Sequence, residues 1–169
     1  MYDVLIIGAG PAGLFAAYLL AENNYKPLII ERGACVEERV KIIEEFWRTG
    51  KLDKNTNVQF GEGGAGTFSD GKLNTLTKDK ENRGKKVFDI FVENGAPEEI
   101  KYINHPHIGT DILRTVIKNI RNKIISMGGE FRFNTTLTNI NVKDNELVSI
   151  ELNNNEIMKC NSLVLAIGH

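Results

Sequence analysis

The sequence predicts an α/β domain, with a central parallel sheet, flanking helices and a three-stranded antiparallel unit. Three observations carry this prediction. A run of branched apolar residues, Val4 to Ile7, leads into a glycine-rich turn and an apolar helix. A second apolar run then ends on the acid Glu31. Near the other end of the chain, three short alternating segments precede a last apolar run over 162–167.

The composition excludes several classes of partner. The chain has 169 residues, of which 41% are hydrophobic and 25% charged, and its net charge of −1 offers no broad basic field for nucleic acid. The longest apolar run, Leu14 to Ala21, is too short to span a bilayer, and no basic segment precedes the first strand as in a signal peptide. We therefore expect neither a nucleic-acid nor a membrane partner. Two cysteines fit the reducing cytoplasm better than a disulfide scaffold.

The turn after the first strand has the spacing of a dinucleotide-binding loop. Gly8 permits a tight turn, Gly10 lets the backbone approach a pyrophosphate, and Gly13 lets the helix pack against the strand. Pro11 suits the first helical turn, whose free N–H groups would face the phosphates. Glu31 follows Gly8 by 23 residues, near the spacing of a carboxylate that binds the adenosine ribose. The context favours a dinucleotide site over an empty turn.

Apolar periodicity predicts three further helices. The first covers about 36–48 and stops at Gly50, and the second covers about 85–93. The third has Thr110 or Asp111 as its expected N-cap and runs to about Met127. The apolar face of the first is Val40, Ile43, Phe46 and Trp47, with Trp47 expected in the core. The buried stripe of the third is Leu113, Val116, Ile117, Ile120 and Ile124, with Arg114, Lys118, Arg121 and Lys123 outside it.

The rest of the chain predicts strands. One covers 131–134, three short antiparallel strands cover 136–142, 147–152 and 156–159, and a final buried strand covers 162–167. Because the chain stops in an apolar strand, we expect residues 1–169 to be one domain, the N-terminal part of a longer protein whose C-terminal part is missing.

The position of the third parallel strand discriminates between ligands. In a simple nicotinamide-binding domain that strand follows the second after one crossover helix. Here the third parallel strand waits until Phe131, 100 residues after Glu31, and a glycine-rich excursion over 51–107 fills the gap. Four glycines within 61–66 can fold closely around a planar or phosphorylated ligand, although a mobile surface loop has the same composition.

These features carry a family resemblance over essentially the whole chain. The strings are VLIIGAGPAGL, IIERG, NVQFGEGGAGTFSDGKL, PHIGTDILR and LVLAIGH. The chain resembles the FAD-binding part of the glutathione-reductase-like flavoproteins. More narrowly, it is similar to the bacterial FAD-dependent (NAD(FAD)-utilising) dehydrogenases. The resemblance implies a Rossmann-like FAD/NAD(P)-binding domain.

The resemblance also implies a role for each matching segment. Gly8, Gly10, Ala12 and Gly13 would hold the pyrophosphate, beside Pro11. Glu31 would bind the ribose, and Arg32 would lie beside the adenine. Gly63, Gly64 and Ala65 would lie near the pyrophosphate and the ribityl end. Leu137 would meet the adenine through backbone atoms. The segment Ala166-Ile167-Gly168 would occupy the place of a second small-residue fingerprint, which is usually Ala-Thr-Gly. Ile167 removes the hydroxyl of that fingerprint but not its backbone contacts.

Other polar residues receive no catalytic role. His105 and His107 lack the third ligand that zinc needs, and Cys35 and Cys160 do not form the CxxC of a disulfide reductase. Asp70 and Lys72 could lie in a site loop, but solvated turn residues are the more common outcome.

The leading hypothesis is a flavin-dependent oxidoreductase in which FAD passes hydride between NADH or NADPH and an unknown small-molecule substrate. A nicotinamide-dependent dehydrogenase that uses the first fingerprint alone is the alternative. A third is a non-catalytic binder on this fold, as in the Rab GDP-dissociation inhibitors.

Overall fold

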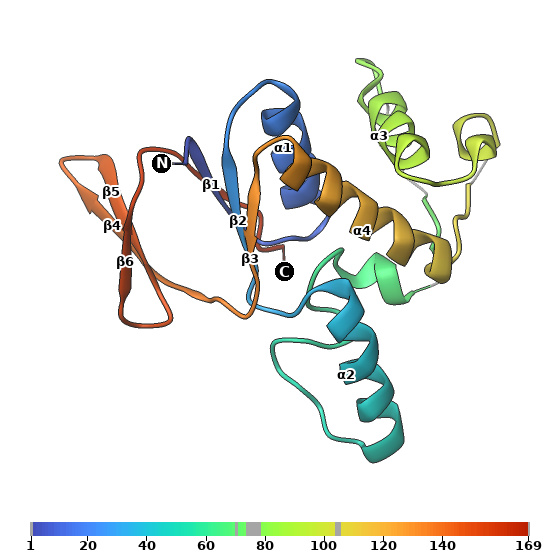
Figure 1. Cartoon of the computed structure of the whole chain (residues 1–169), viewed down its shortest axis with the longest axis horizontal. Coiled ribbons are helices and arrows are strands. Elements are labelled where there is room, and N and C mark those ends of the chain that lie inside the picture. Colours follow the sequence, from blue (N-terminus) through green and yellow to red (C-terminus); the bar gives the residue numbers. More distant parts are fainter. Residues whose placement is uncertain (1, 70, 74–78, 104–105, 169) are drawn as a thin grey trace.

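The computed structural model describes residues 2–69, 71–73, 79–103 and 106–168. Its centre is a parallel sheet in the order β3-β2-β1-β7, with a separate antiparallel sheet in the order β4-β5-β6 (Figure 1). The parallel strands are β1 (Val4–Ile7), β2 (Pro27–Ile30), β3 (Glu130–Arg132) and β7 (Leu163–Leu165). The antiparallel strands are β4 (Leu137–Lys143), β5 (Glu146–Leu152) and β6 (Glu156–Lys159). The predicted fold class is confirmed.

The two faces of the parallel sheet are covered by different layers. Helices α1 (Pro11–Glu22) and α4 (Thr110–Ser126) lie on one face and the antiparallel sheet on the other (Figure 1). Side chains of a strand alternate between faces, so Ile6 of β1 packs into the helical core. Its neighbours Leu5 and Ile7 pack against Ile150 and Leu152 of β5. Both faces of the two central strands are therefore covered, which explains why β1 and β2 are apolar throughout, whereas the edge strand β3 carries Glu130 and Arg132.

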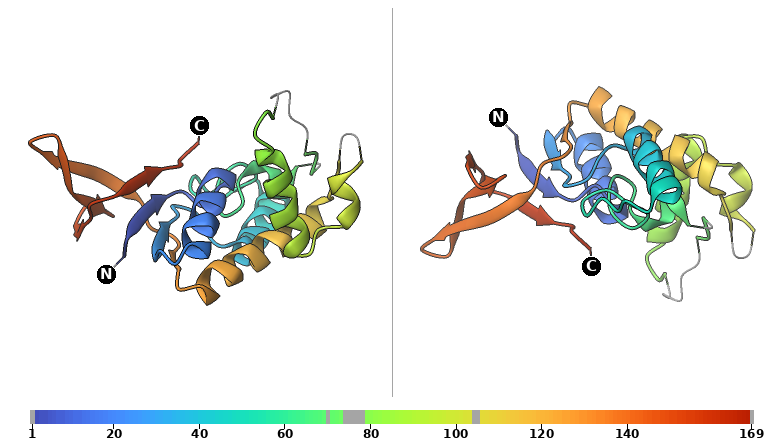
Figure 2. Two further views of the ribbon diagram at one scale, coloured as in Figure 1. Left: turned by 90° about the horizontal axis from the view of Figure 1, so that it is seen from above. Right: turned by 90° about the horizontal axis from the view of Figure 1, so that it is seen from below.

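The expected excursion separates β2 from β3. Helix α2 (Val36–Thr49) precedes it, and the excursion itself contains η1 (Ala65–Phe68), α3 (Arg83–Glu93) and η2 (Glu98–Lys101). In the part of 51–107 that the structure describes, the one strand-like pairing is an isolated bridge between Lys72 and His107. Helix α3 lies at the opposite end of the molecule from the antiparallel sheet (Figure 2). As predicted, β3 then joins the edge of β2 in parallel register.

Two side-chain placements correct the sequence prediction. Trp47 is 63% exposed, not part of the core, because α2 is buried through Val36, Arg39 and Ile43 while its last turn extends away from the domain (Figure 1). Arg121 is only 8% exposed, although periodicity placed it outside the stripe of α4. It is buried because its guanidinium pairs with acids from α2 and the following loop.

Two element boundaries also differ from the prediction. Helix α4 begins at Thr110 itself, and Gly109 takes the N-cap position with no side-chain hydrogen bond. The last strand is shorter than predicted and is half-buried, since β7 forms an edge of the sheet and Leu165 is 53% exposed.

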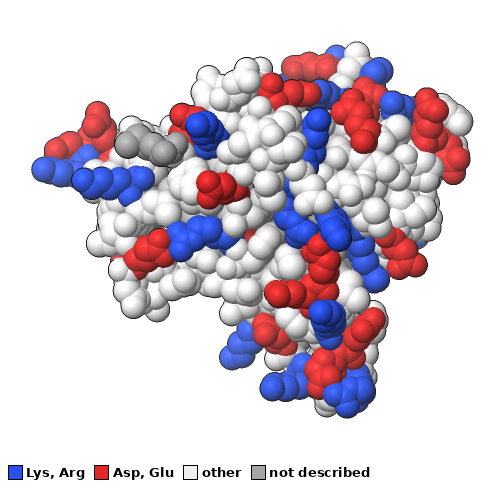
Figure 3. All heavy atoms as spheres, viewed as in Figure 1, with Lys and Arg blue, Asp and Glu red and all other residues white. Residues whose placement is uncertain are grey.

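Charges of both signs are interspersed over the face in Figure 3, in keeping with the net charge. None of the helices in the described residues is long and apolar enough to cross a membrane.

Candidate functional site

A cavity of about 700 Å³ opens where β1, β2 and β7 end. Ligands of open parallel sheets bind at this carboxyl edge. Its walls come from the β1–α1 turn, the end of β2, the segment after α2, the entry to β4 and the end of β7. The lining residues are Ile7, Gly8, Gly10, Pro11, Ala12, Ile30, Glu31, Arg32, Gln59, Phe60, Gly61, Gly64, Ala65, Thr135, Thr136, Leu137, Leu165, Ala166, Ile167 and Gly168.

The glycines of the β1–α1 turn have different tasks. Gly8 has a φ of +103°, a left-handed conformation that favours glycine. A Cβ on Gly13 would lie 1.9 Å from the carbonyl oxygen of Gly8, so Gly13 permits the close packing of α1 on β1. A Cβ on Gly10 would meet no protein atom within 4 Å. Since Gly10 lines the cavity, it leaves open a space there that a ligand can occupy.

The N-terminus of α1 faces this space uncapped. No side chain caps Gly10, and Pro11 lacks an N–H. Leu14 donates to the Gly10 carbonyl, whereas the described residues supply no acceptor for the N–H groups of Ala12 and Gly13. Two free donors and the positive end of the helix dipole suit a phosphate.

Glu31 connects two turns of the cavity wall. It is 7% exposed, and its Oε2 and Oε1 accept hydrogen bonds from the N–H groups of Ala9 and Gly33, both at 2.7 Å. Each carboxylate oxygen has a further lone pair. The same side chain can therefore fix the turns and still accept a hydroxyl hydrogen bond from the cavity side.

The cavity has an aromatic wall beside Arg32 that was not predicted from the sequence. The guanidinium carbon of Arg32 lies 4.9 Å from the ring centroid of Phe60, a cation–π contact. Gln59, Thr135 and Thr136 complete this region. Phe60 directly precedes the glycines in the NVQFGEGG string, and that position was the one available signal.

Residues 57–67, which we call the glycine loop, form the wall opposite the turn. Twelve of the fourteen predicted site residues line the cavity, and Gly13 and Gly63 do not. Gly63 lies behind the wall: its N–H donates to the Ala9 carbonyl at 2.8 Å, and a Cβ there would meet Thr67 and Ile117. Gly63 thus ties the loop to the turn.

An ionic cluster, buried at Glu62 and Arg121 and partly exposed at Glu37, lies beside the glycine loop. Arg121 donates to Glu62 and to Glu37, both at 2.6 Å, and Glu62 also accepts from the Val36 N–H. Burial raises the pKa of Glu62 to about 7, and its Oε1 has no hydrogen-bond partner among the residues that the structure describes. Burial also opposes ionisation of Glu37, but hydrogen bonds led by Arg121 outweigh it and lower the pKa of Glu37 to about 2.

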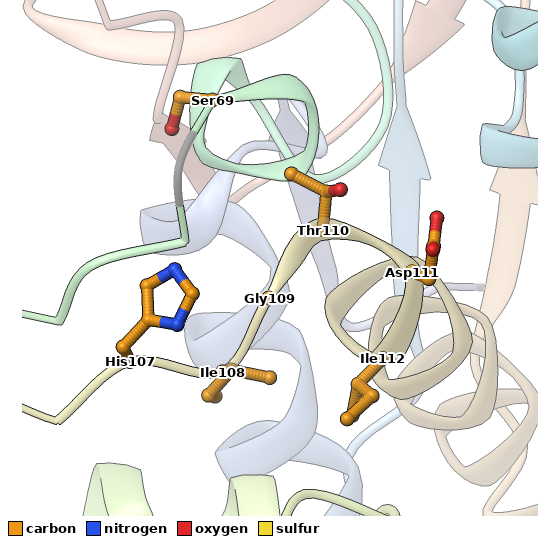
Figure 4. Close-up of a pocket in the computed structure, with 7 residues that line it drawn as sticks. All are labelled: Ser69, His107, Ile108, Gly109, Thr110, Asp111 and Ile112. Atoms are coloured by element: carbon orange, nitrogen blue, oxygen red, sulfur yellow. The ribbon is translucent and has the colours of Figure 1, made fainter.

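A second cavity, of about 470 Å³, lies at the start of α4 (Figure 4). It is lined by Ser69, His107, Ile108, Gly109, Thr110, Asp111 and Ile112. The Asp111 carboxylate pairs with Arg114 instead of His107. The described residues contain no group of three or more His, Cys, Asp or Glu side chains that could hold a metal ion. His105 and Asp70 lie outside the described residues.

A parallel sheet with a glycine turn, an uncapped helix and an acid after the second strand defines a Rossmann-type dinucleotide-binding domain. The comparisons with known proteins agree. The family described as "Pyridine nucleotide-disulphide oxidoreductase" matches residues 2–169, so the chain belongs to this family. The fold, the site and the family together define the class: a dinucleotide-binding domain of an oxidoreductase family. Both cysteines of the chain, Cys35 and Cys160, are free.

An uncharacterised protein of Clostridium beijerinckii is 52% identical over 165 residues, which cover 98% of this chain and 30% of that protein. Digeranylgeranylglycerophospholipid reductase of Methanocaldococcus jannaschii is 34% identical over 54% of this chain and 25% of its own length. The chain thus spans less than a third of these relatives.

Among solved structures, THI4 of Thermovibrio ammonificans matches with a TM-score of 0.60 at 17% identity, over 99% of this chain and 58% of that one. OTEMO in complex with FAD and NADP matches with a TM-score of 0.58 at 17% identity, over 99% of this chain and 25% of that one. These similarities support the fold.

Proposed function

We propose that the cavity at the end of β1 and β2 binds FAD, with its pyrophosphate over the N-terminus of α1. The observation that carries the proposal is the meeting of three features in one cavity: the open space at Gly10, the free N–H groups of Ala12 and Gly13, and the buried carboxylate of Glu31. Their chemistry suits a pyrophosphate joined to a ribose.

The remaining wall residues fit the two ends of such a ligand. Arg32, Phe60 and Leu137 would enclose the adenine, while Gly64 and Ala65 of the glycine loop would lie along the pyrophosphate and the ribityl chain. Ala166, Ile167 and Gly168 would meet the ligand through their backbone atoms. Gly13 and Gly63 would act from behind the wall, by holding α1 and the glycine loop in place.

We further propose that the whole protein is an oxidoreductase of the FAD-dependent, NAD(FAD)-utilising dehydrogenase group, within the glutathione-reductase-like flavoproteins. When bound, FAD supplies the redox chemistry, accepting hydride from NADH or NADPH and passing it to a small-molecule substrate. This domain, residues 1–169 with its excursion over 51–107, contributes cofactor binding. The C-terminal part of the longer protein would present the substrate, and the two free cysteines support a cytoplasmic location.

Anaerobic reduction of the FAD-loaded full-length protein tests this function. We expect NADH or NADPH to bleach the flavin absorption and to be oxidised in equal amount. Tight FAD binding without bleaching of the flavin by either nucleotide would favour the non-catalytic binder. Binding of NADH by a protein that takes up no FAD would favour the nicotinamide alternative.

A further inference from the structure

Arg39 is a charged side chain that the proposed FAD site does not use directly. It lies on the buried face of α2, is 0% exposed, and is among the largest fully buried side chains of the described residues. A buried guanidinium is unfavourable unless its N–H groups are hydrogen-bonded. The partners of Arg39 therefore indicate what the residue is for.

Nearly all of those partners are carbonyl groups of the glycine loop. Nε donates to the Asn57 carbonyl at 2.9 Å, and Nη2 donates to that of Val58 at 3.1 Å. Nη1 donates to the carbonyls of Glu62 and Gly64, both at 2.7 Å. It has longer contacts with the Gly61 carbonyl at 3.4 Å and the Thr67 hydroxyl at 3.0 Å. The ring of Phe68 lies over the guanidinium, 4.5 Å away.

These bonds replace a secondary structure that the loop lacks. Residues 57–64 belong to no helix or strand, and Gly61, Gly63 and Gly64 have φ values of +116°, +81° and +68°. Glycines of this kind allow peptide groups to rotate at little steric cost. The orientation of the loop's peptide groups therefore depends on their hydrogen bonds: the N–H groups of Glu62 and Gly63 bind the Ala34 and Ala9 carbonyls, and Arg39 binds several of the carbonyl oxygens.

That orientation matters for the cavity. Gly64 lines the cavity, and a Cβ on it would lie 3.1 Å from Cδ of Pro11, at the start of α1. Arg39 and the Thr67 hydroxyl, at 2.7 and 2.6 Å, both donate to the Gly64 carbonyl. Because buried Arg39 binds this oxygen from the protein interior, its partial negative charge is directed away from the region proposed for the pyrophosphate. A rotated peptide would present the oxygen to the phosphates and repel them.

We propose that Arg39 is a positioning residue of the FAD site, which acts through the glycine loop by holding its carbonyl oxygens inward. The inference rests on the proposed function, because it concerns the same ligand. Lysine should not replace arginine here. The planar fork serves carbonyls spread from Asn57 to Gly64, whereas an ammonium donates from a single point.

The test compares three variants of the full-length protein: Arg39→Lys, Arg39→Met and Ile43→Ala. Ile43 lies on the same buried face of α2 and is 1% exposed, so its truncation destabilises the helix packing without removing a hydrogen bond. Thermal midpoints of the FAD-free proteins are measured first. FAD dissociation constants and the visible circular dichroism of bound flavin are then measured well below every midpoint.

We expect the lysine variant to bind FAD on the order of tenfold more weakly, the methionine variant more weakly still, and both to alter the flavin dichroism. Ile43→Ala should keep the wild-type affinity and dichroism despite a lowered midpoint. If affinity falls in all variants in proportion to their midpoints, or is unchanged in Arg39→Lys, the inference is wrong. If the methionine variant does not fold, the lysine variant decides. Failure of the wild type to bind FAD would refute the proposed function instead.

Discussion

At the residue scale, Glu31 combines structural and ligand-binding tasks. Its carboxylate already accepts two backbone N–H groups, from Ala9 and Gly33, and it lines the cavity. We expect Glu31→Ala to weaken FAD binding by on the order of 1.5–3 kcal/mol, since a charge-assisted hydrogen bond is lost. Equilibrium titration with FAD measures the change. Equal FAD retention by the variant and the wild type under identical washing would show that Glu31 does not bind the ribose.

Two neighbouring glycines provide a matched pair of variants. Gly10→Ala should leave the thermal midpoint unchanged or slightly raised, because φ of −71° suits alanine and the methyl meets no protein atom. It should nevertheless weaken FAD binding by roughly tenfold or more, because the methyl occupies the ligand's space.

Gly13→Ala should instead lower the thermal midpoint. Its methyl would lie 1.9 Å from the Gly8 carbonyl oxygen, so we expect a loss of roughly 1–3 kcal/mol of stability from overpacking. Midpoints and FAD titrations of the two variants, measured side by side, separate the effects. Normal FAD affinity in Gly10→Ala would place the pyrophosphate elsewhere. Gly64→Val would not test ligand contact in the same way, because the φ of Gly64 is +68° and any side chain there strains the backbone.

Glu62 predicts a pH dependence of stability. Its pKa is raised by burial from 4.5 to about 7, so the folded protein holds the proton more tightly than the unfolded chain. The associated stability is fully present below pH 4.5 and is lost as the pH rises towards about 7, by on the order of 2 kcal/mol. Glu37, with a lowered pKa of about 2, titrates below this window.

The matched variant is Glu62→Gln, which stays neutral at every pH. Between pH 4.5 and 7 the thermal midpoint of the wild type should fall relative to that of the variant. Parallel midpoint curves for the two proteins would show that Glu62 does not take up a proton in this range.

At the scale of elements, the sequence predicted the helices, strands and turns that local residue patterns specify. The glycine turn, α1, the stripe of α4 and the antiparallel strands were all predicted, because periodicity and turn residues specify them. The fourteen expected site residues came from motif spacing and resemblance, and twelve of them line one cavity.

Long-range contacts account for what the sequence did not show. Arg121 looked like a surface residue because its partners, Glu37 and Glu62, are distant in sequence. The glycine loop is held by contacts from other elements, among them the hydrogen bonds of Arg39 and that of Gly63 to Ala9, and nothing in the loop's own composition distinguishes it from a mobile segment. Phe60 was not predicted as a site residue because its partner, Arg32, lies on another segment and is distant in sequence.

At the scale of the whole molecule, the 169-residue chain alone should be a poor enzyme. Leu165, at the end of the edge strand β7, and Ile167, just after it, line the cavity and are 53% and 65% exposed. We expect this chain to be catalytically silent, to bind FAD weakly, and to self-associate through that edge. Steady NADH oxidation by a monomeric 169-residue chain with added FAD would contradict this, and would place the catalytic residues within it.

The central claim is that the cavity at the ends of β1, β2 and β7 is an FAD site. The most direct test is to denature the purified full-length protein and to identify and quantify the released cofactor by chromatography. We predict FAD, at close to one molecule per chain after reconstitution, and far less from Gly10→Ala at an unchanged thermal midpoint. A full-length protein that releases no flavin, and retains none after incubation with FAD, would contradict the claim.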